Sequence, residues 1–223
     1  FPTEVLSLPS KGLLYPEDSP LRSGTIDVKY MTAKEEDILT STNLIEQGVV
    51  ITRLLESVIA NSKVKLDDML IGDKNAIMVG TRILGYGANY EISLVDPDTN
   101  ERVEHTVDLS KLNNKKIDEK LFENGNNFEF ELPNSKRIVG FKLLTHGDES
   151  EIENTLKEFE KVEKLTGVSY SLTTRLKHQI VSIDGNTDQK EIDKFVDNEF
   201  LALDTRAYRK HLDEITPDIE LKF

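Results

Sequence analysis

The hydrophobic positions of this chain follow a helical period in two regions and alternate one by one in the region between them. Residues 25–31 and four short runs between residues 90 and 144 alternate apolar and polar side chains, which is the period of a β-strand. The regions whose spacing predicts helices are 33–47, 50–59, about 74–84, and most of 148–216. The pattern therefore predicts an α+β fold, in which a helical domain carries an inserted small antiparallel β module.

Several side chains predict where the helices begin and end. Thr32 and Glu35 are spaced as a capping box, in which the two side chains bind free backbone N–H groups at the helix start. We expect the first helix to break near residues 41–43, and we expect a separate helix over residues 171–181. The residues expected to cap later helices are Asp73, Thr187 and Asp204.

The first 24 residues are predicted to form an extended arm, because four prolines interrupt any helix there. The arm is nevertheless apolar, so it is expected either to pack on its own domain or to dock on a neighbouring subunit. Further boundaries follow from the changes of period. The predicted parts are the arm over residues 1–24, a first helical part over 25–88, the β module over 89–146 and a second helical part over 147–223.

Two apolar segments near the ends of the chain are the predicted partner-binding sites. A short tail with alternating apolar residues can add as a strand to the edge of a partner's sheet. Deleting residues 1–16 is expected to weaken partner binding and to leave the helical domain folded. The residues expected to contact a partner are Leu8, Pro9, Leu13, Leu14 and Tyr15 in the arm, and Ile219, Leu221 and Phe223 in the tail.

Charge and composition narrow the classes of partner. The 223 residues include 28 Lys and Arg against 41 Asp and Glu, a formal net charge of -13. Binding to phosphates requires a basic surface, so neither nucleic acid nor an anionic membrane is an expected partner. No apolar run reaches the roughly 18 residues that span a bilayer, and no secretory leader is expected. The absence of Cys excludes disulfides and thiolate metal sites.

No residue pattern predicts catalysis, a cofactor or a metal. The four His residues lack a metal-binding spacing, and the Asp96-x-Asp98 turn has Glu101 where a calcium loop needs Gly. No P-loop and no serine-nucleophile elbow is present. We therefore expect no catalytic, cofactor-binding or metal-binding residues and no small-molecule substrate. A cell-wall hydrolase whose carboxylates are assembled from distant parts of the sequence stays an alternative.

Several phrases of the sequence resemble one family. They are Leu8-Pro9-Ser10-Lys11-Gly12, the run from Tyr30 to Ser41, and residues 70–76, 82–90, 204–210 and 216–218. These phrases are similar to the baseplate hub and hub-assembly proteins of T4-type contractile-tailed phages, densely over residues 8–90 and thinly over 91–195. The resemblance implies a non-enzymatic component or assembly factor of the hub, which is located in the virion tail baseplate, is assembled in the host cytoplasm and binds other phage tail or baseplate proteins. A transient tail-assembly chaperone that is absent from the mature virion is the second alternative.

Overall fold

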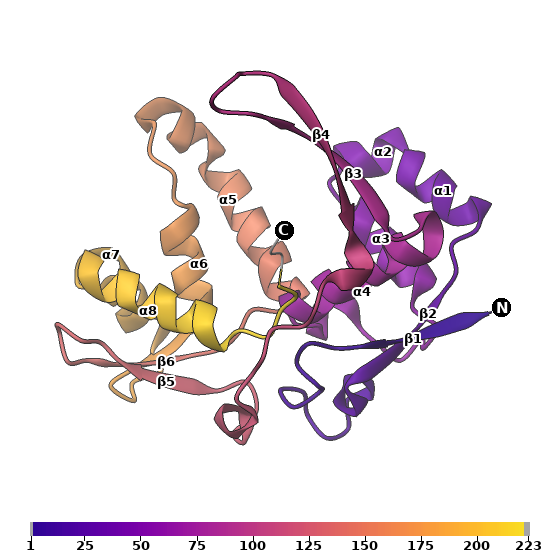
Figure 1. Ribbon diagram of the computed structural model, residues 1–223. Helices are drawn as coiled ribbons and strands as arrows, with labels where there is room; N and C mark the ends of the chain where they lie inside the picture. The colour runs from indigo at the N-terminus through magenta and orange to yellow at the C-terminus, as the bar shows by residue number, and fades with distance from the viewer. Residues whose placement is uncertain (1, 221–223) are drawn as a thin grey trace.

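The protein has an α+β fold, as the sequence predicts (Figure 1). The computed structural model describes residues 2–220. The α-helices are α1 (Ala33–Thr40), α2 (Thr42–Glu46), α3 (Val50–Val58), α4 (Ile71–Tyr86), α5 (His146–Thr166), α6 (Ser171–Gln179), α7 (Gln189–Asn198) and α8 (Ala202–Ile215). The short 3₁₀ helices are η1 (Pro20–Ser23), η2 (Leu66–Asp68), η3 (Leu109–Lys111) and η4 (Glu119–Phe122).

The strands form three small antiparallel sheets, β1–β2, β3–β4 and β5–β6–β7. The first sheet lies beside the N-terminal helices, and the third lies beneath α6, α7 and α8 (Figure 1). The strands are β1 (Thr3–Ser7), β2 (Thr25–Lys29), β3 (Asn89–Val95), β4 (Arg102–Asp108), β5 (Phe128–Glu131), β6 (Ile138–Phe141) and β7 (Ile180–Ile183).

The N-terminal segment is folded into the body of the protein, and it contains a strand and a 3₁₀ helix where the sequence predicts only an extended arm. Strand β1 pairs with β2, and η1 follows with Pro20 at its start, where a missing N–H breaks no helical hydrogen bond. Between them the chain turns through Gly12, where φ is +76° and a Cβ would lie 2.4 Å from the carbonyl oxygen of Arg22. The Arg22 side chain donates in turn to the carbonyl of Leu13 at 2.7 Å. The prolines exclude a long α-helix here, but they allow a strand, packed turns and the short 3₁₀ helix η1.

The predicted break in the first helix is confirmed, because α1 ends at Thr40 and α2 begins at Thr42. The capping box is confirmed as well. Thr32 donates its backbone N–H to the Glu35 carboxylate at 2.8 Å, and the Thr32 hydroxyl accepts from the first turn of α1. Helix α3 then buries one side of its apolar stripe, formed by Leu54, Leu55 and Val58.

Helix α4 begins before its predicted cap. Its N-cap is Leu70, so Asp73 lies inside the first turn, where it is fully buried and accepts hydrogen bonds from the N-terminal segment. Gly72 lies in the same turn, and a Cβ on this residue would lie 1.8 Å from the carbonyl oxygen of Pro217. The first turn of α4 is therefore contacted from both ends of the chain.

The strands expected to form one inserted β module belong to two separate sheets, which corrects the predicted boundary at residue 146. Within residues 2–220, β3 and β4 pair only with each other, whereas β5 and β6 share a sheet with β7. Strand β7 includes part of the segment 171–181 that is predicted to be helical. Helix α6 ends at Gln179 because the following Ile180-Val181-Ser182-Ile183 run is rich in β-branched residues, which favour strands.

Two C-terminal helices also start at other residues than predicted. The N-cap of α7 is Asp188 rather than Thr187. Helix α8 begins two residues before Asp204, so that this carboxylate lies in the first turn and is fully buried. It accepts the backbone N–H groups of Asn134 at 2.8 Å and Ser135 at 3.0 Å, in the turn between β5 and β6.

One cluster of buried apolar side chains extends from Leu8 to Ile215 and therefore joins both helical parts of the chain. Near its C-terminal end the rings of Phe141 and Tyr208 meet edge to face, with their centroids 5.2 Å apart. The helical parts predicted over residues 25–88 and 147–223 thus share one core. Within the described residues, no helix is both long and apolar enough to cross a bilayer.

Candidate functional site

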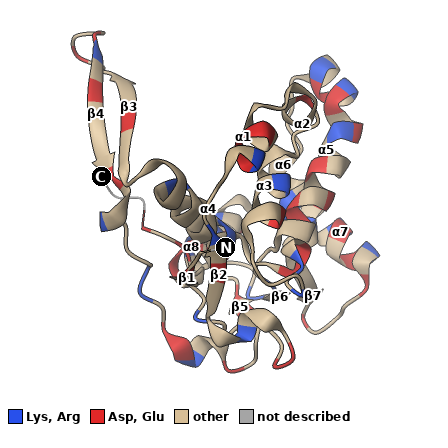
Figure 2. Cartoon of the chain, turned by 90° about the vertical axis from the view of Figure 1, so that its right-hand side faces the viewer, with Lys and Arg blue, Asp and Glu red and all other residues tan. Residues whose placement is uncertain are grey.

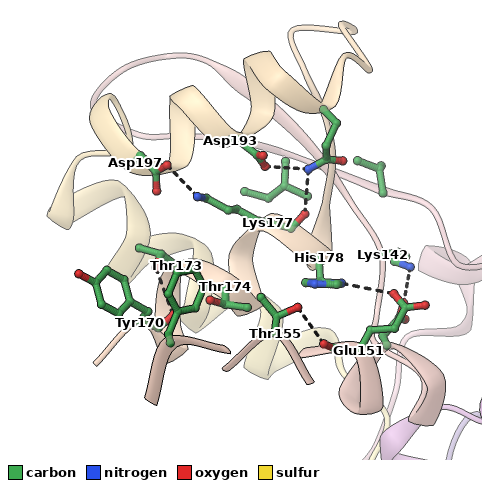
Figure 3. A pocket seen from close by; sticks show the side chains of 15 residues that line it. Lys142, Glu151, Thr155, Tyr170, Thr173, Thr174, Lys177, His178, Asp193 and Asp197 are labelled. Atoms are coloured by element: carbon green, nitrogen blue, oxygen red, sulfur yellow. Dashed lines mark hydrogen bonds and ion pairs between the residues drawn. The ribbon is translucent and has the colours of Figure 1, made fainter. Parts of the chain in front are cut away.

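A groove of about 940 Å³ lies beside α6 and is lined from α5, α6 and α7 (Figure 3). Such a concave site with ionisable side chains is the usual place to look for catalysis or ligand binding. Two lysines in the groove are already paired: Lys142 Nζ lies 2.7 Å from Asp148 Oδ1, and Lys177 Nζ lies 2.7 Å from Asp197 Oδ2. In each pair the lysine and the aspartate neutralise each other within the chain.

The remaining acids of the groove also have neighbours of their own. Gln189 Nε2 donates to Asp193 Oδ1 at 2.8 Å, and His178 Nδ1 lies 3.8 Å from Glu151 Oε2 (Figure 3). Hydrolysis by paired carboxylates requires two acids that converge on one bond of a substrate. Asp148, Asp193 and Asp197 are hydrogen-bonded to the chain's own side chains, so the groove gives the hydrolase alternative little support. Within residues 2–220, no group of three or more His, Asp or Glu side chains is placed to hold a metal ion.

The structure places the predicted arm residues mostly in the interior. Leu8 is 1% exposed, and Leu14 and Tyr15 are 5% exposed. Pro9 is also buried, and Leu13 is half-buried. In this structure the arm packs on its own domain, which is the first of the two alternatives. A partner could reach the buried side chains only if the segment left the core. Their role in docking therefore stays a prediction.

The predicted tail is also partly paired within the chain. Ile219 forms a β-bridge with Asn114, and the N–H of Glu220 donates to the carbonyl of Asn113 at 2.8 Å. Leu221 and Phe223 lie outside the described residues, so their partner contacts stay a prediction.

A more accessible candidate is the β3–β4 hairpin, which projects from the end of α4 (Figure 1). Arg82 holds its base, because the guanidinium donates to the carbonyl of Gly87 at 3.0 Å and lies 5.0 Å and 5.5 Å from the ring centroids of Tyr86 and Tyr90. Gly87 has φ of 81° and ψ of 169°, a conformation available almost only to glycine. These contacts direct the hairpin away from the body.

The other strand is also anchored where it leaves the body. Leu109 donates its N–H to the carbonyl of Ala88 at 2.9 Å, which closes the base of the hairpin. The Asp108 carboxylate accepts the hydroxyl of Ser110 at 2.6 Å, and this hydrogen bond lowers the pKa of Asp108. Both ends of the hairpin are therefore held, while its length extends beyond the core.

One face of the hairpin is apolar and uncovered. Side chains at alternate positions of a strand share a face, and the register fixes which residues are opposite each other. The pairs on this face are Tyr90–Val107, Ile92–His105 and Leu94–Val103. Tyr90 is 45% exposed, Leu94 is 51% exposed and Val103 is 38% exposed. We call these six residues the Leu94 face.

The opposite face and the tip are strongly acidic. Residues 89–108 carry one arginine, Arg102, against six carboxylates. The opposite face contains the pairs Glu91–Thr106, Ser93–Glu104 and Val95–Arg102. The carboxylates are Glu91, Asp96, Asp98, Glu101, Glu104 and Asp108. Figure 2 shows this acidic hairpin standing away from the rest of the molecule.

The sequence contains the signal for this surface, since the alternation of Tyr90, Ile92 and Leu94 predicts the strand. Alternation does not say whether the apolar face is covered by a neighbouring element. That information comes only from the fold, which within residues 2–220 pairs β3 and β4 with no other strand and leaves Tyr90, Leu94 and Val103 exposed.

Comparison with known proteins identifies the family. The family model described as T4 bacteriophage base plate protein matches residues 7–214, from the end of β1 to the last turn of α8. Neither the curated proteins nor the solved structures that were compared gave a match. The matched region contains the hairpin, the groove and almost the whole core. The chain therefore belongs to the T4 bacteriophage base plate protein family.

Proposed function

We propose that this chain is a non-enzymatic subunit of the baseplate hub and that it works by binding other tail proteins. The observation that carries the proposal is the uncovered Leu94 face. Water-exposed apolar surface of this kind, on a projecting element, is typical of a protein–protein contact. Membership of the baseplate family indicates the assembly in which the partners are to be sought.

The pairing of ionisable side chains in the groove beside α6 supports a role without catalysis. Asp148 and Asp197 accept hydrogen bonds from lysines, and Asp193 accepts one from Gln189. A general acid and a general base work by exchanging protons with a substrate, which requires access to that substrate. Side chains that are engaged with one another suit a structural role better than a catalytic one.

The charge of the chain supports protein partners rather than nucleic acid or membrane. A formal net charge of -13 repels phosphate groups and anionic lipid surfaces, whereas it attracts basic protein surfaces. We place the chain in the virion tail baseplate, after assembly in the host cytoplasm and without a cofactor or small-molecule substrate.

Quantitative mass spectrometry of purified particles, alongside lysate of infected cells, tests this proposal. A hub subunit is expected in the particles at a fixed ratio to other baseplate proteins, and it should remain with isolated baseplates. A chain that is abundant in the lysate but missing from particles would instead be the transient assembly chaperone. Release of soluble fragments from purified cell wall by the full chain would contradict the absence of catalysis.

A further inference from the structure

The β3–β4 hairpin combines two unlike surfaces on one projecting element. The Leu94 face is apolar, whereas the tip and the opposite face carry the six carboxylates. An isolated two-stranded hairpin is only marginally stable in water unless another element covers it. Within residues 2–220, β3 and β4 pair with no other strand, and the side chains of Tyr90, Leu94, Val95 and Val103 are 38% to 56% exposed. We consider another molecule as the cover, because the described elements of this chain do not provide it.

On the basis of the proposed function, we infer that the hairpin inserts into a cleft of another tail protein that has an apolar floor and a basic rim. The Leu94 face lies on the floor. Lysine and arginine side chains of the rim face the tip and the opposite face of the hairpin. The inference thus names the chemistry of the partner as well as the surface that binds it.

The charge pattern argues against a second copy of this chain as the occupant. Two hairpins that meet would bring together six carboxylates and one arginine from each molecule. Each whole chain also carries a formal net charge of -13. Two copies therefore repel each other once they are closer than about a Debye length, which is about 8 Å at physiological salt. A basic cleft attracts both the acidic hairpin and the negatively charged chain. The same attraction raises the rate at which the two proteins associate.

The base of the hairpin suits insertion, because Arg82, Gly87 and the Ala88–Leu109 hydrogen bond hold the direction in which it projects. An element whose direction is fixed before binding loses less conformational freedom on docking than a flexible loop does. The base contacts therefore set the direction of the hairpin before it meets a partner.

Leu94 and Val95 provide a matched pair of positions for the test. They are adjacent and similarly exposed, at 51% and 56%, but they lie on opposite faces. The other tail proteins of the phage that encodes this chain are purified one by one and titrated with the full chain. For the true partner, Leu94→Ser should raise the Kd about tenfold or more, as for a buried interface contact, whereas Val95→Ser should change it less than about twofold.

A second pair of variants tests the basic rim without touching the apolar face. Glu104→Lys lies on the opposite face of the hairpin, and Glu158→Lys makes the same change of charge on the exposed side of α5. Glu104→Lys should weaken binding at least about threefold and flatten its salt dependence, while Glu158→Lys should leave both unchanged. This pair keeps the test valid if Leu94→Ser disturbs the hairpin itself.

Several results would overturn the inference. They are equal affinities of the Leu94→Ser and Val95→Ser variants, binding that is insensitive to salt, or the absence of any tail protein that binds the wild-type chain. A concentration-dependent dimer that Leu94→Ser abolishes in sedimentation would make a second copy the occupant and overturn it too. A tail protein that binds all variants equally would overturn only this inference, because the proposed function is decided separately by the content of the particles.

Discussion

Ser10 and Asp73 are 63 positions apart in the chain and are joined by two buried hydrogen bonds. The Ser10 N–H donates to Asp73 Oδ1 at 2.9 Å, and its hydroxyl donates to Oδ2 at 2.6 Å. The Tyr15 hydroxyl adds a third at 2.6 Å and itself accepts the N–H of Leu70 at 2.9 Å. Burial raises the pKa of Asp73, and the hydrogen bonds from Ser10 and Tyr15 oppose that rise. The network fixes the N-terminal segment to the first turn of α4.

Replacing Asp73 with Asn should destabilise the protein. The amide keeps one acceptor oxygen but turns an NH₂ donor toward the donors of Ser10 and Tyr15. The free energy of unfolding should fall by about 2–3 kcal/mol, as expected for lost hydrogen bonds to a buried charged group. Urea unfolding followed by circular dichroism measures the change. Asp18→Asn, at an exposed position nearby, is the control and should stay within about 0.5 kcal/mol of wild type.

Asp204 makes a similar contact between α8 and the turn that joins β5 and β6. Burial acts to raise its pKa, but the hydrogen bonds from Asn134 and Ser135 outweigh burial, so the pKa of Asp204 is lowered. Asp204→Ala leaves two backbone N–H groups without their acceptor and should lower the free energy of unfolding by about 2–3 kcal/mol. Asp213→Ala, on the exposed side of the same helix, is the control in a thermal melt. Equal melting temperatures for the two variants would contradict this role.

The Glu35 carboxylate should make stability depend on pH in the acid range. Burial acts to raise its pKa, but hydrogen bonds from Ser57 and Thr32 outweigh burial and lower the pKa from 4.5 to about 2. The unfolded chain therefore binds this proton more readily than the folded chain does. The contribution of Glu35 to stability is complete above pH 4.5 and is lost as the pH falls toward about 2.

Glu35→Gln should therefore lower the melting temperature at pH 7 and flatten its decline between pH 4.5 and about 2. The amide cannot ionise, so its hydrogen bonds do not change over that range. Glu46→Gln, at an exposed position in α2, should keep the wild-type profile. An acid decline that is as steep in Glu35→Gln as in wild type would exclude Glu35 as its source.

Arg82→Lys should loosen the hairpin without unfolding the core. Lysine keeps the charge but cannot donate to the carbonyl of Gly87 while it stacks on Tyr86 and Tyr90. Amide hydrogen exchange over residues 89–108 should become several-fold faster, while exchange in α3 stays at the wild-type rate. Arg53→Lys, in an exposed pair with Glu56, is the control and should alter neither region. Unchanged exchange in the hairpin would mean that Arg82 does not hold its base.

Local signals in the sequence were sufficient for much of the fold. The capping box of Thr32 and Glu35 located the start of α1, and the apolar stripe through Leu54 and Leu55 located α3. Alternating residues on either side of the turn that contains Asn100 located the β3–β4 hairpin. Each of these features depends on neighbours a few positions away, which is why periodicity and capping reveal it.

Features that depend on distant contacts could not be predicted in this way. Asp73 and Asp204 look like helix caps in the sequence, but each binds a segment more than 60 residues away. Strand β7 follows α6 without a break because β6 supplies its hydrogen-bonding partner. The apolar side chains of Leu8 and Tyr15 resemble docking residues until the fold places them in the core.

The convergence of both chain ends on the first turn of α4 has a consequence for synthesis. Ser10 bonds Asp73 from the N-terminal side, whereas the amide of Asn75 bonds Asp218 and Gly72 lies against Pro217 from the C-terminal side. While residues 217 and 218 of a nascent chain are still inside the ribosome, the first turn of α4 lacks its contacts with these two residues. The native state is therefore completed only when translation of this region is finished, so truncated translation products should stay open to proteases that the full chain resists.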